Sequence, residues 1–107
     1  MRLGASIAAI VALAAFAACV HAASVSIDQS GQQFSEKSLS VATGDSIVFN
    51  NRDDVTHNIN VINADDDAAD LGLQKPGQSL TYKFDKAGRF KIRCSIHPSM
   101  KMTVSVK

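Results

Sequence analysis

Short stretches in which polar and apolar residues alternate run along the chain from residue 24 onward, and turn residues separate them. A β-strand with one face in the core and the other in solvent produces this period of two. The spacing of the apolar residues shows little sign of long helices. We therefore predict strands over residues 24–28, 38–41, 46–50, 57–62, 79–84, 89–94 and 102–106, with a further pairing that starts near Phe34.

Gly, Pro and Asp punctuate these stretches, for example in Thr43-Gly44-Asp45 and Lys75-Pro76-Gly77. About seven to eight short strands joined by turns predict an all-β fold, either a β-sandwich or a small Greek-key barrel. Residues 63–73 are rich in Asp and Ala and lack the alternation. We expect a loop there, with one helical turn.

The first 22 residues follow a different pattern. Met1-Arg2 is a short positive start, residues 7–18 are an almost unbroken apolar run, and Val20-His21-Ala22 ends in a small-x-Ala sequence. This is the layout of a secretory signal peptide, and the apolar run is too short to span a bilayer comfortably. We expect cleavage after Ala22, which leaves one domain of residues 23–107 in the periplasm, without stable insertion in the membrane.

The chain has two cysteines, Cys19 and Cys94. Residues 16–19 loosely resemble a bacterial lipoprotein box, in which Cys19 would carry a lipid, but the ordinary cleavage site after Ala22 competes with it and is favoured. Cys94 is then the lone thiol of an exported domain, where cysteines are usually paired or absent. Because a free thiol is open to oxidation and a small domain gains from a metal staple, we expect Cys94 to be occupied.

Basic and acidic residues are nearly equal in number but unevenly distributed along the chain. Residues 23–70 carry two basic and nine acidic side chains, whereas residues 71–107 carry eight basic and one acidic. No basic patch dominates and aromatic residues are few, so a nucleic-acid partner is not expected. Most of these charges fit a solvated mixed surface, and a docking patch made from some of them stays open.

Residues 94–102 hold the candidate chemistry. Cys94, His97, Met100 and Met102 lie within nine residues, between two predicted strands. Thiolate and thioether are soft ligands that favour copper(I), and a His₂Cys set with a weak axial Met is the blue-copper arrangement. A second imidazole must come from elsewhere, and His57 is the remaining candidate because the other histidine leaves with the signal peptide.

Residues 45–51, His57-Asn58-Ile59, residues 87–90 and Cys94-x-x-His97-Pro-x-Met together resemble the cupredoxins, most of all the amicyanin and plastocyanin branch. The resemblance covers nearly all of the domain and is weakest in residues 63–73. It implies a cupredoxin-like Greek-key β-sandwich that binds one type 1 copper ion. It also implies a carrier of single electrons and no enzyme.

The resemblance assigns the ligands. His57 and His97 would be the imidazole ligands, Cys94 the thiolate, and a Met the axial ligand. The amicyanin spacing selects Met100 and the plastocyanin spacing selects Met102. We favour Met100, because Met102 alternates with the apolar residues of the last strand, as a core residue would.

Three further residues gain roles from the same resemblance. Asn58 would tie the first ligand's loop to Ser95, which follows the ligand Cys, and such hydrogen bonds orient metal ligands. Pro98 would stiffen the loop beside His97. Electrons would pass through the exposed edge of His97, inside a largely uncharged surface.

The expected partners are redox proteins, with an exported dehydrogenase as donor and a c-type cytochrome or oxidase as acceptor, and the protein is expected to be a monomer. The alternative function is a copper-binding carrier or delivery protein without an electron-transfer role. A zinc protein could use His, His and Cys, but Met is a poor zinc ligand. The chain shows no second copper set that would support catalysis.

Overall fold

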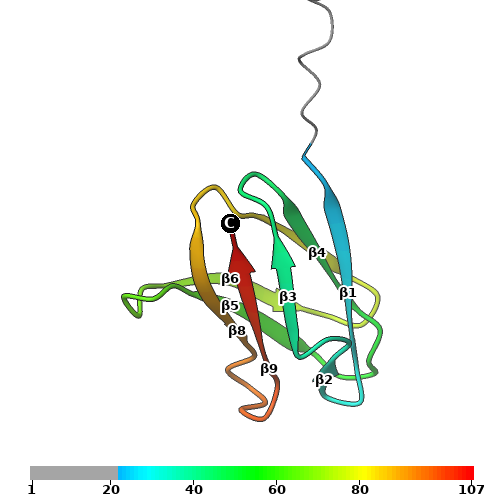
Figure 1. The fold of residues 1–107 in the computed structure, drawn as a ribbon. Helices are drawn as coiled ribbons and strands as arrows, with labels where there is room; N and C mark the ends of the chain where they lie inside the picture. Colours follow the sequence, from blue (N-terminus) through cyan, green and yellow to red (C-terminus); the bar gives the residue numbers. More distant parts are fainter. Residues whose placement is uncertain (1–21) are drawn as a thin grey trace, which may run out of the picture.

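The computed structural model describes residues 22–107, and this part of the chain forms a sandwich of two β-sheets (Figure 1). The nine strands are β1 (Ser24–Ser30), β2 (Gln33–Phe34), β3 (Ser38–Val41), β4 (Ser46–Asn51), β5 (His57–Ile62), β6 (Ala68–Gln74), β7 (Ser79–Lys83), β8 (Gly88–Arg93) and β9 (Lys101–Val106). The predicted all-β sandwich is confirmed, with one or two strands more than expected.

One sheet has the strand order β2-β1-β4-β7 and the other has the order β3-β9-β8-β5-β6. The pairs β1–β4 and β3–β9 are parallel, and the remaining pairs are antiparallel. Within residues 22–107 there is no helix, and so none that could cross a membrane. The predicted signal peptide and Cys19 lie outside the described residues, apart from Ala22 at the expected cleavage site.

The predicted loop with a helical turn at residues 63–73 is wrong over most of its length. Residues 68–74 form β6, which pairs with β5 from Ala68 opposite Ile62 to Gln74 opposite His57. β6 is an edge strand with both faces partly exposed, so its polar residues do not reveal the period of two. A register shift between Asn58 and Asn60 further disturbs the pattern.

The core lies between the two sheets and consists of the inward residues of the alternating strands. Phe49, Ile59, Ile92 and Val104 are fully buried there. Burial of each such side chain contributes about 1.5–3 kcal/mol of hydrophobic free energy. Packing of the core therefore holds the strands in place. At one end of the sandwich, the ends of these strands carry the residues of the predicted metal site.

Candidate metal centre

Three strand ends bring the predicted ligands together. His57 is the first residue of β5, Cys94 follows the last residue of β8, and His97 lies in the loop that joins β8 to β9. β5 and β8 are paired neighbours in one sheet, with Asn60 opposite Arg93. Because β5 begins where β8 ends, His57 and Cys94 lie at the same end of the sandwich.

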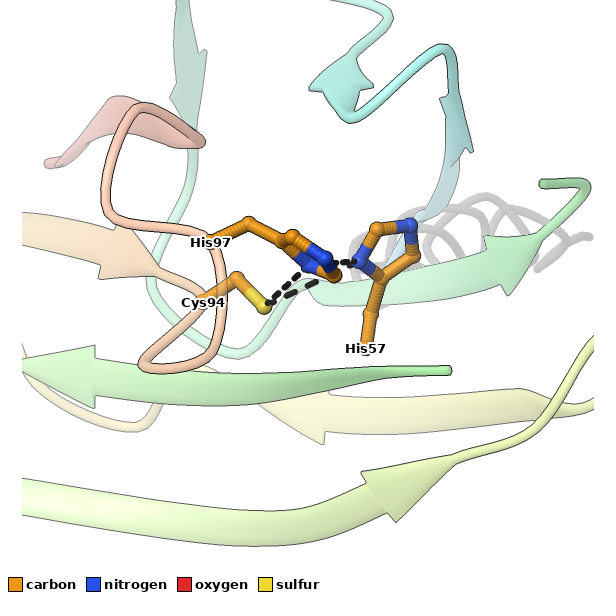
Figure 2. Close-up of side chains that lie close together, drawn as sticks. All are labelled: His57, Cys94 and His97. Atoms are coloured by element: carbon orange, nitrogen blue, oxygen red, sulfur yellow. Dashed lines mark hydrogen bonds between the residues drawn. The ribbon is translucent and has the colours of Figure 1, made fainter. Parts of the chain in front are cut away.

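The donor atoms of these residues converge (Figure 2). Cys94 Sγ lies 3.7 Å from His57 Nδ1 and 3.6 Å from His97 Nδ1, and the two Nδ1 atoms are 3.0 Å apart. His57 and Cys94 are buried, whereas His97 is partly exposed. The two imidazoles and the thiol thus converge on one point, and the imidazole of His97 is the one that reaches the surface.

The backbone shapes this cluster around the sulfur. The backbone N–H of Asn58 donates to Cys94 Sγ at 3.4 Å, which fixes the position of the sulfur. The backbone N–H of Met100 donates to the carbonyl oxygen of His97 at 2.9 Å, and that of Cys94 donates to the carbonyl oxygen of Met100 at 3.3 Å. The loop of residues 94–100 is therefore closed on itself beneath the donor atoms.

The two candidate axial methionines are both buried, but in different settings. Met100 belongs to the closed loop, one residue before β9. Both belong to the buried core cluster, but Met102 lies within β9 opposite Ile92 of β8 and alternates with Val104 and Val106 as an inward residue of the strand. Met102 thus has the place of a strand core residue, and Met100 has the place of a residue held beside His97.

The predicted pair Asn58 and Ser95 is in direct contact. The backbone N–H of Ser95 donates to Asn58 Oδ1 at 2.6 Å, and Asn58 Nδ2 lies 3.4 Å from Ser95 Oγ. The side chain of Asn60 also donates to Ser95 Oγ. These bonds fasten the residue after Cys94 to β5. Pro98 is exposed in the turn that follows His97.

Asp53 is a residue of the site that the sequence reasoning missed. Its Oδ2 accepts a hydrogen bond from His57 Nε2 at 2.9 Å, and its side chain is 9% exposed. An imidazole that donates from Nε2 keeps the lone pair of Nδ1 free, so Asp53 turns the ligand atom of His57 toward Cys94. The available signal was a carboxylate four residues before a ligand His.

The turn between β1 and β2 supports Asp53, which lies in the loop between β4 and β5. The backbone N–H of Gln32 donates to Asp53 Oδ2 at 2.8 Å. Gly31 and Gln32 both have positive φ angles, 60° and 56°, as a two-residue hairpin turn between β1 and β2 requires. The Gln32 amide, followed by His57, holds the pKa of Asp53 well below its usual range. Asp53 is therefore a carboxylate at neutral pH.

A network of buried side-chain amides lies next to His57. Gln74, which pairs with His57, accepts from Gln29 Nε2 at 2.7 Å and donates to the carbonyl oxygen of Phe49 at 2.7 Å. Asn51 Nδ2 donates to the carbonyl oxygen of Gln74 at 2.8 Å. Gln29, Asn51 and Gln74 are 0–1% exposed. This network links β1 and β4 of one sheet to β6 of the other at the metal end of the sandwich.

We expect Asp53→Ala to weaken copper(II) binding by about 10–100-fold, because His57 loses the group that orients it. Asp53→Asn keeps a hydrogen-bond acceptor but removes the charge, so it should raise the reduction potential with a smaller loss of affinity. The reduction potential rises by about 59 mV for each factor of ten by which the affinity for copper(II) falls more than the affinity for copper(I). Redox titration and competition with a copper chelator measure both quantities.

The matched control is Asp54→Asn, which removes the same charge from the neighbouring residue. Asp54 is exposed, and within residues 22–107 its carboxylate makes no hydrogen bond to His57. Its potential should stay near that of the unchanged protein. Equal shifts in Asp53→Asn and Asp54→Asn would show that only general surface charge is at work.

The donor set fits copper. A thiolate sulfur with two imidazole nitrogens is the trigonal set of blue-copper sites, and a buried thioether nearby provides a weak fourth ligand. A structural zinc site uses four Cys or His ligands, and the structure gathers three such residues here. The residues present therefore suit a type 1 copper ion.

Comparison with known proteins agrees with this chemistry. A family model described as copper binding proteins, plastocyanin/azurin family, matches residues 21–107. The methylamine utilization protein MauL of Methylophilus methylotrophus is 32% identical over 79 residues, which cover 72% of this chain and 45% of that protein. The chloroplastic plastocyanin of Tetradesmus obliquus is 33% identical over 111 residues, which cover 92% of this chain and 77% of that protein.

A second MauL, from Methylorubrum extorquens, is 30% identical over 74 residues, so the chain spans 45% and 65% of the length of the two MauL proteins. Among solved structures, the copper(I) form of an amicyanin mutant matches with a TM-score of 0.72 and 23% identity, over 78% of this chain and 82% of that chain. This likeness concerns the fold.

The family, the fold and the donor set together test three of the predictions made from the sequence. Copper proteins of the plastocyanin/azurin family are electron carriers and not enzymes, and redox proteins are their partners in general. The predictions of a cupredoxin, of a type 1 copper cofactor and of a protein without enzymatic activity are therefore confirmed. The chain belongs to the plastocyanin/azurin family of copper binding proteins.

Proposed function

We propose that the protein carries single electrons between redox proteins of the periplasm. The residues that would hold the copper ion are His57 and His97 through Nδ1, Cys94 through Sγ and Met100 through its thioether. When bound, copper supplies a one-electron couple whose potential the axial ligand and the surroundings of the sulfur tune. The observation that carries the proposal is the convergence of three donor atoms within 4.8 Å, with one ligand at the surface.

A carrier must change its charge with little movement of its ligands, and the contacts around the site serve this need. Asp53 fixes the ring of His57, and Asn58 fixes both the sulfur of Cys94 and the backbone of Ser95. The Met100 amide fixes the backbone of His97. The protein thus holds the ring of His57, the sulfur of Cys94 and the backbone of His97 from outside the donor cluster, so the same positions serve both oxidation states.

Met100 is preferred to Met102 because of where each residue is held. Met100 shares the closed loop with Cys94 and His97, to which its backbone is bonded. Met102 packs as an inward residue of β9 and continues the core pattern of Val104 and Val106. Replacing the thioether of Met102 by another apolar side chain should therefore change the packing of the core and leave the copper site unchanged.

The surface around His97 suits brief contacts with another protein. Ile96 is 49% exposed, and Pro98 and Ser99 beside it are exposed and uncharged. Leu73 of β6 is 66% exposed and lies opposite Asn58, whose side chain contacts the loop at Ser95. Exposed apolar side chains around a surface ligand support His97 as the point where electrons enter or leave.

The proposed partners and location follow from the family and from the first 22 residues. The family implies redox partners, and within that class we propose an exported dehydrogenase as donor and a c-type cytochrome or oxidase as acceptor. Two relatives bear the name methylamine utilization protein, which supports a role in the utilization of methylamine. The signal-peptide pattern of residues 1–22 supports cleavage after Ala22, a mature domain of residues 23–107 and the periplasm, in preference to a lipid on Cys19.

The substitution Ile96→Glu tests the electron route. A charge forced into an apolar contact is costly, so electron transfer to a soluble c-type cytochrome should slow by about tenfold or more, or about 1.4 kcal/mol of barrier. The visible copper spectrum should not change. Stopped-flow mixing measures the rate.

Thr81→Glu is the control for Ile96→Glu, since it adds the same charge at an exposed position of β7 in the other sheet. We expect its rate to stay within about twofold of the unchanged protein, as rim charges act mainly through association and its salt dependence. If both variants slowed transfer equally, the electron would not pass through the surface around His97.

A further inference from the structure

Four exposed basic side chains line one groove beside the metal end of the sandwich. They are Lys37, Lys91, Arg93 and Lys101, and we call this surface the basic groove. Its walls also include Ser99 and Met100 of the ligand loop. β2 lies against β9 at the same end of the molecule as that loop (Figure 1).

Strand register concentrates positive charge at the loop. Arg93 and Lys101 lie directly opposite each other on β8 and β9. Like charges in this position destabilise a β-sheet. Within residues 22–107 none of the four basic groups forms an ion pair with a carboxylate, whereas Arg52 and Lys83 do. Stability alone would favour an acidic residue at one of the two positions, so the pair indicates a role outside the domain.

Positive charge is least compensated next to the ligands. Farther along β8, Lys91 and Arg89 share a second hollow with Asp66, which offsets part of their charge. Arg93 immediately precedes Cys94, and Lys101 immediately follows Met100. A surface bound in the basic groove therefore rests against the ligand loop, on the side of Met100.

We propose that the basic groove docks an acidic surface of the redox partner and orients it so that the partner meets the ligand loop. The inference rests on the proposed electron-carrier function and adds the chemistry of the partner. Charge complementarity across an interface steers encounter and fixes orientation, while the apolar surface around Ile96 supplies the close contact. Three of the eight basic residues of 71–107, namely Lys91, Arg93 and Lys101, thus acquire a functional explanation.

The test compares two double charge reversals of equal net charge. Arg93→Glu/Lys101→Glu reverses the groove pair, and Lys86→Glu/Lys107→Glu reverses two exposed basic residues that flank the far ends of the same two strands. Stopped-flow rates with an acidic soluble c-type cytochrome are measured between low and high salt. The groove reversal should slow association at low salt by about tenfold or more and flatten the salt dependence.

The control reversal should change the rate by less than about threefold, and the two variants should converge at high salt, where surface charges are screened. NMR titration of the copper(I) protein with the same cytochrome gives a second readout, in which the amides of Lys91, Arg93 and Lys101 should shift. Equal slowing by both reversals would mean that net charge alone steers the encounter, and would overturn the proposal.

Two further measurements separate the possible failures. Ascorbate reduction and ferricyanide oxidation of the unchanged protein test electron carriage without any partner, so failure there counts against the proposed function. Normal exchange with these reagents, combined with an unaffected cytochrome rate in the groove reversal, counts against the basic groove alone. If instead the protein co-sedimented with anionic phospholipid vesicles, lost this binding in the groove reversal and showed no NMR shift on adding cytochrome, the basic groove would be assigned to a lipid surface. This result would overturn the proposal of a protein partner.

Discussion

The substitution Cys94→Ser should remove the intense visible absorption of the copper(II)-loaded protein. That band comes from the copper–thiolate bond, and Cys94 is the one cysteine among residues 23–107. The hydroxyl of Ser has nearly the same shape as the thiol, so the sandwich should persist even though the site is buried. An absorption spectrum of the copper(II) form and far-ultraviolet circular dichroism measure the two outcomes.

The control for this change is Ser95→Ala, next to Cys94 in the same loop. Ser95 holds Asn58 chiefly through its backbone N–H, which the substitution retains. The visible band should therefore survive with only a small change. A Cys94→Ser protein that remained blue, or a Ser95→Ala protein that lost the band, would contradict the role given to the Cys94 thiolate.

The substitution Met100→Leu should raise the reduction potential and alter the visible spectrum while copper stays bound. Loss of a weak axial thioether removes electron density that favours copper(II). Met102→Leu provides the matched comparison, because it deletes a thioether from an equally buried residue two positions away. It should behave as a volume-conserving core change that costs less than about 1.5 kcal/mol of folding free energy.

Redox titration and thermal unfolding of both variants distinguish the two methionines. The account requires a change of potential in Met100→Leu and a change confined to stability in Met102→Leu. The reverse pattern would assign the axial role to Met102, and the loop would then have the longer, plastocyanin-like ligand spacing.

The sequence predicts the strands well where one face is buried. In β4 and β9 every second residue enters the core, so the apolar pattern is clear. The cluster of His57, Cys94 and His97 could also be predicted, because Cys94 and His97 share one short loop and His57 is the other histidine of residues 23–107. Local pattern and elimination are sufficient for these features.

Features that depend on contacts distant in sequence could not be predicted in this way. β6 is recognised by its pairing with β5, because an edge strand does not need alternating apolar residues. Asp53 and Gln32 meet through the packing of a hairpin turn against another loop, 21 residues apart. Gln29 and Gln74 are residue types usually found at the surface, yet both are buried, where Gln29 Nε2 donates to Gln74 Oε1 across 45 residues of sequence.

Stepwise reduction of the copper(II) protein in the presence of a copper(I) chelator tests electron carriage most directly. The account predicts that one electron per protein bleaches the visible band, that reoxidation restores it in full over repeated cycles, and that copper stays bound, because Asp53, Asn58 and the Met100 amide hold the ligands in place. Transfer of the copper to the chelator on reduction, with no recovery of the band, would contradict electron carriage and indicate a copper delivery protein instead.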